Sequence, residues 1–253
     1  MEELAPQTLF TGQQLLWLPE CASTNTEAHN LVVKNSATDG CTIITDNQTA
    51  GRGQRGNRWE AAAGENLTLS VVWRPTFLAA TDQFQLSRAV ALAVHDWAAT
   101  LLGPDPALRL KWPNDLYFGT QKLGGILIEN TLSGAKIQHS IIGIGLNINQ
   151  QHFAVPTATS MALLTGRPHA RPALAARLLE SLEARYLQLR AGHVAQQQQD
   201  YLHVLYRYQQ PALYEVAGQA VSGQIEGVDP TGRLLVRIDH ELRAFGLQEI
   251  VYR

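Results

Sequence analysis

The sequence contains few cysteines, no long apolar run and no marked excess of charge. Its two cysteines, Cys21 and Cys41, form no CxxC pair, which argues against a disulfide scaffold or a zinc site and favours a reducing compartment. No run of about eighteen apolar residues is present to span a membrane. The formal net charge of −2 argues against a general nucleic-acid binder. Because no basic region followed by an apolar run opens the chain, no signal peptide is expected, and the predicted location is the cytoplasm.

The apolar content, in contrast, is ample for a sizeable core, since 45% of the 253 residues are hydrophobic. Residues 1–208 combine strand and helix patterns and predict a mixed α+β main domain. Residues 209–253 contain short alternating runs separated by glycines and by the turn sequence Asp-Pro-Thr-Gly, which predict a small all-β barrel. We therefore expect two domains, 1–208 and 209–253.

Local patterns locate the elements of these domains. Strands are expected at 15–18, 41–45, 67–73, 108–112, 116–118, 122–129 and 137–148, and in the barrel at 212–216, 220–228, 234–238, 242–245 and 250–252. Helices are expected after Ser23, at 84–102, within 160–189 and at 194–206. Ser23 and Thr24 either cap the first helix or offer hydrogen bonds to a polar ligand. Gly143 and Gly145 lie inside a strand, so we expect something to pack tightly against the backbone there.

The most distinctive segment is 49–59, which contains three glycines, three arginines and a tryptophan. Glycine lets backbone amides approach a ligand closely, and the arginine fork suits phosphate or carboxylate. The spacing of Gly51, Gly53 and Gly56 matches the dinucleotide fingerprint. However, a strand follows where that fingerprint needs a helix, which disfavours a dinucleotide site. The segment predicts an anion-binding loop between two strands.

Three further polar or glycine-rich clusters, Lys111–Asp115, Lys122–Gly125 and Gly143–Asn147, also fall at strand ends and turns. Each of them alone fits an ordinary turn. If all four clusters converge, their combined chemistry is cationic with one carboxylate, Asp115, that is able to hold Mg²⁺. Such a site suits a nucleoside triphosphate meeting a second acid. No Gly-x-Ser-x-Gly elbow or zinc-protease spacing is present, which disfavours serine and metal hydrolysis.

Five segments together resemble biotin protein ligases in order and approximate spacing. They are Ser23–Asn25, Gln48–Gly53, Lys111–Asp115, Lys122–Leu127 and Gly143–Asn147. The match covers about residues 15 to 150, while the later helices and the terminal β module agree only in type. The resemblance implies a mixed β-sheet catalytic domain flanked by helices and a small C-terminal SH3-like β-barrel. It also implies that biotin and Mg-ATP form biotinyl-5′-adenylate, and that a lysine of a biotin carboxyl carrier protein then attacks this mixed anhydride.

The resemblance assigns roles to individual residues. Lys122 and Arg52 would be catalytic, because preorganised cations help two anions approach one another. The biotin-binding residues would be Ser23, Thr24, Asn25, Gln48, Gly51, Arg52, Gly53, Gln54, Lys122 and Gly125. The ATP-binding residues would be Arg55, Asn57, Trp59, Lys111, Asn114 and Asn147. Asp115 would contact Mg²⁺, and the closed loop would keep water from the adenylate.

Two rival functions stay open beside the biotin ligase. One is a lipoate or octanoate attachment enzyme of the same fold, against which the arginine-rich loop and Lys111–Asp115 argue. The other is a non-catalytic biotin sensor, which would need an effector segment. We expect neither a DNA partner nor a membrane partner, because only some 14 residues precede the first expected strand and no spanning run exists. The sequence does not decide whether the chain forms a homodimer through its main sheet, as family members often do.

Overall fold

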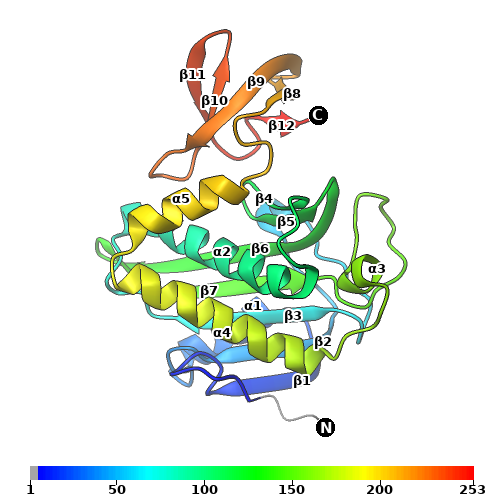
Figure 1. The fold of residues 1–253 in the computed structure, drawn as a ribbon. Helices are drawn as coiled ribbons and strands as arrows, with labels where there is room; N and C mark the ends of the chain where they lie inside the picture. The colour runs from blue at the N-terminus through cyan, green and yellow to red at the C-terminus, as the bar shows by residue number, and fades with distance from the viewer. Residues whose placement is uncertain (1–4) are drawn as a thin grey trace.

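A seven-stranded mixed sheet forms the centre of the molecule in the computed structural model, which describes residues 5–253 apart from the side chain of Arg55 (Figure 1). Its strands lie in the order β1-β2-β3-β7-β6-β5-β4. Their bounds are β1 Leu15–Cys21, β2 Thr42–Gln48, β3 Leu67–Trp73, β4 Leu108–Lys111, β5 Asp115–Phe118, β6 Gln121–Ser133 and β7 Lys136–Leu146. β1 is parallel to β2, and every other neighbouring pair is antiparallel. Each strand expected in the main domain is present.

Helices cover both faces of this sheet. Their bounds are α1 Thr24–Val33, α2 Gln83–Leu102, α3 Met161–Thr165, α4 Arg171–Arg190 and α5 Val194–Val204. The long helices α2 and α4 pack together over one face, and α1 lies behind the sheet in Figure 1. The expected end of α2 is confirmed, because Gly103 follows it with a φ of 78°, a conformation that favours glycine. Among the described helices, none combines the length and apolar character needed to cross a bilayer.

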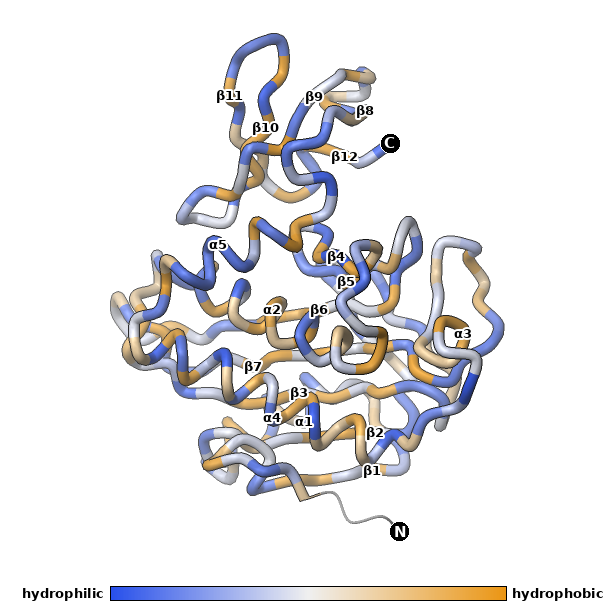
Figure 2. The backbone as a smooth tube through the Cα atoms, viewed as in Figure 1, coloured by the Kyte–Doolittle hydropathy of each residue, from blue (hydrophilic) through white to orange (hydrophobic). Residues whose placement is uncertain are grey.

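The two covered faces explain why β3 is buried along its whole length. Val71 faces the large apolar cluster under α2 and α4, and its neighbour Val72 faces a smaller cluster under α1. Successive side chains of a strand point to opposite faces, so a strand with helices on both sides is apolar at consecutive positions. Figure 2 shows this apolar centre as orange segments along the middle strands. The buried sheet is the rigid floor on which the site described below is built.

A second, five-stranded antiparallel sheet follows, in the order β11-β10-β9-β8-β12. Its strands are β8 Pro211–Val216, β9 Gln219–Val228, β10 Leu234–Ile238, β11 Glu241–Phe245 and β12 Val251–Tyr252, in agreement with the expected strands. The large apolar cluster continues into this sheet, including Tyr214, Ile225 and Leu234. Trp112 also donates a hydrogen bond of 2.9 Å to the Gly232 carbonyl. The boundary at residue 208 and the closure of the sheet into a barrel stay predictions.

Candidate active site

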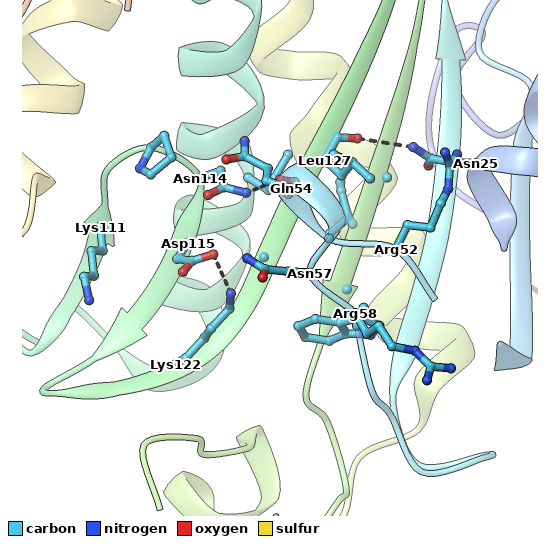
Figure 3. A pocket seen from close by; sticks show the side chains of 18 of the residues that line it. Asn25, Arg52, Gln54, Asn57, Arg58, Lys111, Asn114, Asp115, Lys122 and Leu127 are labelled. Atoms are coloured by element: carbon cyan, nitrogen blue, oxygen red, sulfur yellow. Dashed lines mark hydrogen bonds and ion pairs between the residues drawn. The ribbon is translucent and has the colours of Figure 1, made fainter. Parts of the chain in front are cut away.

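The four polar clusters singled out in the sequence converge on one cavity of about 370 Å³ (Figure 3). This volume falls within the range of small-molecule sites, roughly 300–1,000 Å³. The cavity lies against β6 and β7, under the loop after β2, and the end of the C-terminal sheet forms part of its wall. The residues from the four clusters that line it are Arg52, Gly53, Gln54, Asn57, Arg58, Trp59, Lys111, Trp112, Pro113, Asn114, Asp115, Lys122, Gly125, Gly143, Ile144 and Gly145. The expected convergence is therefore confirmed.

Glycines of β6 and β7 form the floor of the cavity, where Gly125 pairs directly with Gly145. A Cβ on Gly143 would lie 2.4 Å from Oδ1 of Asn25, and a Cβ on Gly145 would lie 2.4 Å from Cε2 of Trp59. Both distances are far shorter than an ordinary contact, so neither position tolerates a side chain while its neighbour stays in place. The expectation of tight packing against this strand is confirmed, and the packing groups are two predicted site residues.

The start of α1 forms one wall of the cavity, with neutral hydrogen-bonding groups. Ser23 occupies the position before the helix, but its hydroxyl makes no capping hydrogen bond. Instead Oε1 of Gln48 accepts hydrogen bonds from the amide (2.8 Å) and the hydroxyl (3.2 Å) of Thr24. Because this oxygen is engaged, Gln48 meets a ligand with its amide donors. The wall therefore offers donors and the Ser23 hydroxyl to an uncharged polar group.

The loop after β2 folds into a small hairpin. The backbones of Arg52 and Arg58 pair in an isolated antiparallel β-bridge, and a 3-10 turn spans Gln54–Gly56. The guanidinium of Arg52 makes a two-pronged ion pair with Glu129 of β6, at 2.9 and 3.1 Å. Glu129 also accepts a hydrogen bond of 2.7 Å from Nδ2 of Asn25. One carboxylate therefore holds two of the predicted biotin-binding side chains.

Lys122 carries the cation at the centre of the cavity. Its ammonium lies 2.6 Å from Oδ1 of Asp115, and Figure 3 shows the two side chains pointing toward one another. A Cβ on Gly125 would approach both groups, at 3.2 Å from Asp115 and 3.3 Å from Lys122. The backbone of Lys122 is fixed by hydrogen bonds to Thr157 and Thr159. The ion pair therefore sits on an anchored strand beside bare backbone, where an anion would find the lysine already in place.

A second cation, Lys111, lies at the end of β4 between two aromatic rings. Its ammonium is 4.5 Å from the ring centre of Tyr117 and 4.8 Å from that of Tyr252, and it donates a hydrogen bond of 3.2 Å to the Tyr117 hydroxyl. Burial lowers the pKa of Lys111, while the charge of Asp115 acts in the opposite direction. Burial also raises the pKa of Tyr117 to about 12, so its hydroxyl stays neutral at physiological pH.

Other predicted site residues have structural contacts or lie outside the main cavity. Nδ2 of Asn114 donates to the Ile126 carbonyl at 2.5 Å and secures the turn after β4, although the residue lines the cavity. Asn147 is buried, lies outside the lining, and donates to the Thr159 carbonyl at 2.9 Å. Gly51 lines an adjoining hollow behind the loop, and the side chain of Arg55 lies outside the described residues. Their ligand roles stay predictions.

Sequence reasoning missed Glu129 and the contribution of the C-terminal sheet. Glu129 could have been found, because alternate residues of a strand share one face, and Gly125, Leu127 and Glu129 follow that spacing. Tyr252 belongs to no motif, and no sequence signal indicates that it reaches the cavity. Arg58 lies within the predicted loop and lines the cavity without having been assigned a role.

The cavity offers one carboxylate as a ligand for Mg²⁺. Within residues 5–253, no group of three or more histidine, cysteine, aspartate or glutamate side chains is arranged to hold a metal ion. Mg²⁺ needs no such cage, since it is commonly bound by one or two carboxylates together with substrate phosphates and water. The single carboxylate of Asp115 in the cavity wall fits an ion that arrives with a nucleotide.

Fold and cavity together define an α+β domain whose cavity, lined by arginine and lysine side chains, suits small molecules with anionic groups. Residues 17–147 match the model of the biotin/lipoate A/B protein ligase family. The chain belongs to this family.

Curated relatives and solved structures agree with this membership. The chain is 34% identical over 89% of its length to the biotin–[acetyl-CoA-carboxylase] ligase of Mycobacterium tuberculosis, covering 84% of that protein. It is also 34% identical over 71% of its length to the bifunctional ligase/repressor BirA of Bacillus spizizenii, of which it spans 56%. The fold is similar to that of a biotin protein ligase from Aquifex aeolicus in complex with biotin and ATP, with a TM-score of 0.78, 23% identity, and coverage of 95% and 99% of the two chains. The expected fold class is confirmed.

Proposed function

We propose that this chain is a biotin protein ligase. In the first step a carboxylate oxygen of biotin attacks the α-phosphorus of ATP, the bond to the β-phosphate breaks, and biotinyl-5′-adenylate and pyrophosphate form. In the second step a lysine amine of a biotin carboxyl carrier protein attacks the carbonyl carbon. The bond to AMP then breaks, AMP leaves, and the amine loses a proton.

The observation that carries this proposal is the placement of Lys122 between two different walls of one cavity. On one side lie the neutral donors of Ser23 and Gln48, which suit the uncharged ring of biotin. On the other side lie Lys111 and the turn at Asn114, which suit a nucleotide. The carboxylate and the α-phosphate would meet beside Lys122, whose positive charge offsets their repulsion without reorganisation during the reaction.

The loop after β2 would close over the joined ligands. Arg52 keeps donors for a ligand, because its pair with Glu129 uses two of the five N–H groups of the fork. Trp59 lies against Gly145 and shields the floor of the cavity. Exclusion of water by this cover would protect the adenylate, which hydrolyses readily as a mixed anhydride.

Magnesium and the carrier protein complete the proposal. Asp115, with the nucleotide phosphates, would hold Mg²⁺, which neutralises phosphate charge. The carrier would present its lysine at the open side of the cavity. A cytoplasmic location stays a prediction, and so does homodimer formation, which sedimentation with and without biotin would test.

Transfer to a carrier separates this function from its rivals. The protein is incubated with ATP, Mg²⁺ and a biotin carboxyl carrier domain, with biotin, lipoate or octanoate as the acid, and the carrier is weighed. A mass gain of one biotinyl group is expected only with biotin, and a carrier whose acceptor lysine is replaced by arginine serves as the control.

The other outcomes identify the rivals. A gain with lipoate or octanoate alone would assign the chain to the related acyl ligases. Biotin binding with no mass gain and no pyrophosphate release would support a biotin sensor and overturn the enzyme.

A further inference from the structure

The C-terminal sheet contributes an aromatic side chain, Tyr252, to the side of the cavity proposed to bind the nucleotide. No sequence motif indicates this residue. Tyr252 lies in β12, which pairs with β8, and its ring stands 4.8 Å from the ammonium of Lys111. Tyr117 of β5 presents a second ring at 4.5 Å from the same ammonium. A cation within about 6 Å of an aromatic ring centre is attracted by the negative face of the ring.

Further rings hold these two in place. Tyr206 contacts both Tyr117 and Tyr252, with ring centres 5.9 and 6.0 Å apart, and Tyr214 packs edge-on to Tyr252 at 5.5 Å. Aromatic pairs at such separations favour these tilted and edge arrangements. The position of Tyr252 is therefore set by its neighbours rather than by its attraction to Lys111.

The ring, and not the hydroxyl, is the part of Tyr252 that acts on Lys111. Within the described part of the chain the buried Tyr252 hydroxyl has no hydrogen-bond partner. The side chain of Lys111 has four flexible methylenes. The negative charge of Asp115 acts to raise the pKa of Lys111, and so attracts its ammonium. Without a ring on each side, the ammonium would be free to turn toward that carboxylate.

We propose that Tyr252 is a positioning residue, which with Tyr117 clamps the Lys111 ammonium where the phosphates of ATP enter the cavity. This inference rests on the proposed function. It assigns to the C-terminal sheet a specific task in nucleotide binding, and it predicts that biotin binding is indifferent to the clamp. A desolvated cation held in this way also loses less freedom when it binds a phosphate.

The test compares Tyr252→Leu with Tyr252→Phe by pyrophosphate release in the presence of biotin. The leucine variant is expected to raise the KM for ATP on the order of tenfold, the factor that corresponds to losing one cation–ring contact. The KM for biotin should stay as in the parent. Phenylalanine keeps the ring and should restore the parent KM for ATP. Arg253→Ala, which removes an exposed ion pair with Glu215 at the adjacent residue, is the matched control.

A double-variant cycle separates positioning from general damage to the fold. If Tyr252 acts through Lys111, then Tyr252→Leu has no further effect on the KM for ATP when Lys111→Met is already present. A further loss in that background, or failure of Tyr252→Phe to restore binding, would overturn the clamp. So would an unchanged KM in Tyr252→Leu. These results differ from failure of the proposed function, in which the parent protein itself would release no pyrophosphate with biotin.

Discussion

Gly145→Ala offers a direct test of how the cavity floor holds the loop. The new methyl group would stand 2.4 Å from Cε2 of Trp59, and ordinary contact begins at 3.4 Å, so the indole must move by about 1 Å or more. The indole belongs to a partly exposed loop residue and can yield without disturbing the sheet. We therefore expect a loss of only about 1 kcal/mol of folding stability, the lower end of the overpacking range.

The effect on catalysis should be much larger. A misplacement of about 1 Å at a reacting site can cost on the order of 100-fold in rate. Adenylation is measured as pyrophosphate release and stability as Tm, for which about 1 kcal/mol corresponds to roughly 2–4 °C in a chain of this size. A large loss of rate with a small shift in Tm is the expected outcome.

Two comparisons make this prediction refutable. Gly124→Ala meets the carbonyl oxygen of Gly145 at 2.7 Å, and backbone cannot yield easily, so its Tm should fall further. In a Trp59→Ala background, Gly145→Ala should have little additional effect, because the clash has been removed. An active Gly145→Ala enzyme, or one that loses rate only in proportion to stability, would show that Trp59 is not held by the floor.

Three further predictions concern charges. Lys122→Ala should reduce adenylation far more than stability, since a partly exposed lysine contributes little to folding; equal losses in both would contradict its role. Arg52→Ala and Glu129→Gln should each speed release of the adenylate while changing stability by less than about 1 kcal/mol. Release at the parent rate would show that the Arg52–Glu129 ion pair does not hold the loop over the adenylate. Burial alone would raise the pKa of Asp96, but hydrogen bonds from neighbouring basic side chains lower it overall. Its contribution to stability is therefore present above its ordinary pKa of 3.8 and is lost as pH falls through the lowered value. Asp96→Asn should accordingly lower Tm at neutral pH but not in strong acid, whereas a constant difference would be inconsistent with this linkage.

Much of the fold could be predicted because its signals are local. The strand at 67–73 and the helix ending at Gly103 follow from periodicity and stop signals within each segment. The tight packing at Gly143 and Gly145 could be predicted too, since glycine in a strand interior needs a reason. What packs there, Asn25 and Trp59, depends on contacts between segments far apart in the chain.

The parts of the site that escaped prediction are the long-range ones. Glu129 meets Arg52 only because the loop after β2 crosses to β6, which two other strands separate from it in the sheet order. Tyr252 reaches Lys111 only through the placement of the C-terminal sheet. The motif predicts a nucleotide contact for Asn147, and the motif does not indicate that its amide also donates a hydrogen bond to the Thr159 carbonyl. Motifs indicate which residues line the cavity, but the order of the strands in the sheet determines which side chains are in contact.

The apolar cluster shared by the two sheets has a consequence for cooperativity. Phe84 of α2 packs against Tyr201 of α5 and approaches Gly232, in the turn between β9 and β10, so closely that a Cβ there would lie 2.7 Å away. With Tyr214 and Ile225 in the same cluster, neither sheet can separate without exposing apolar surface of the other. The whole chain is therefore expected to unfold in a single calorimetric transition, with no state in which the main sheet stands intact while the aromatic clamp on Lys111 is lost.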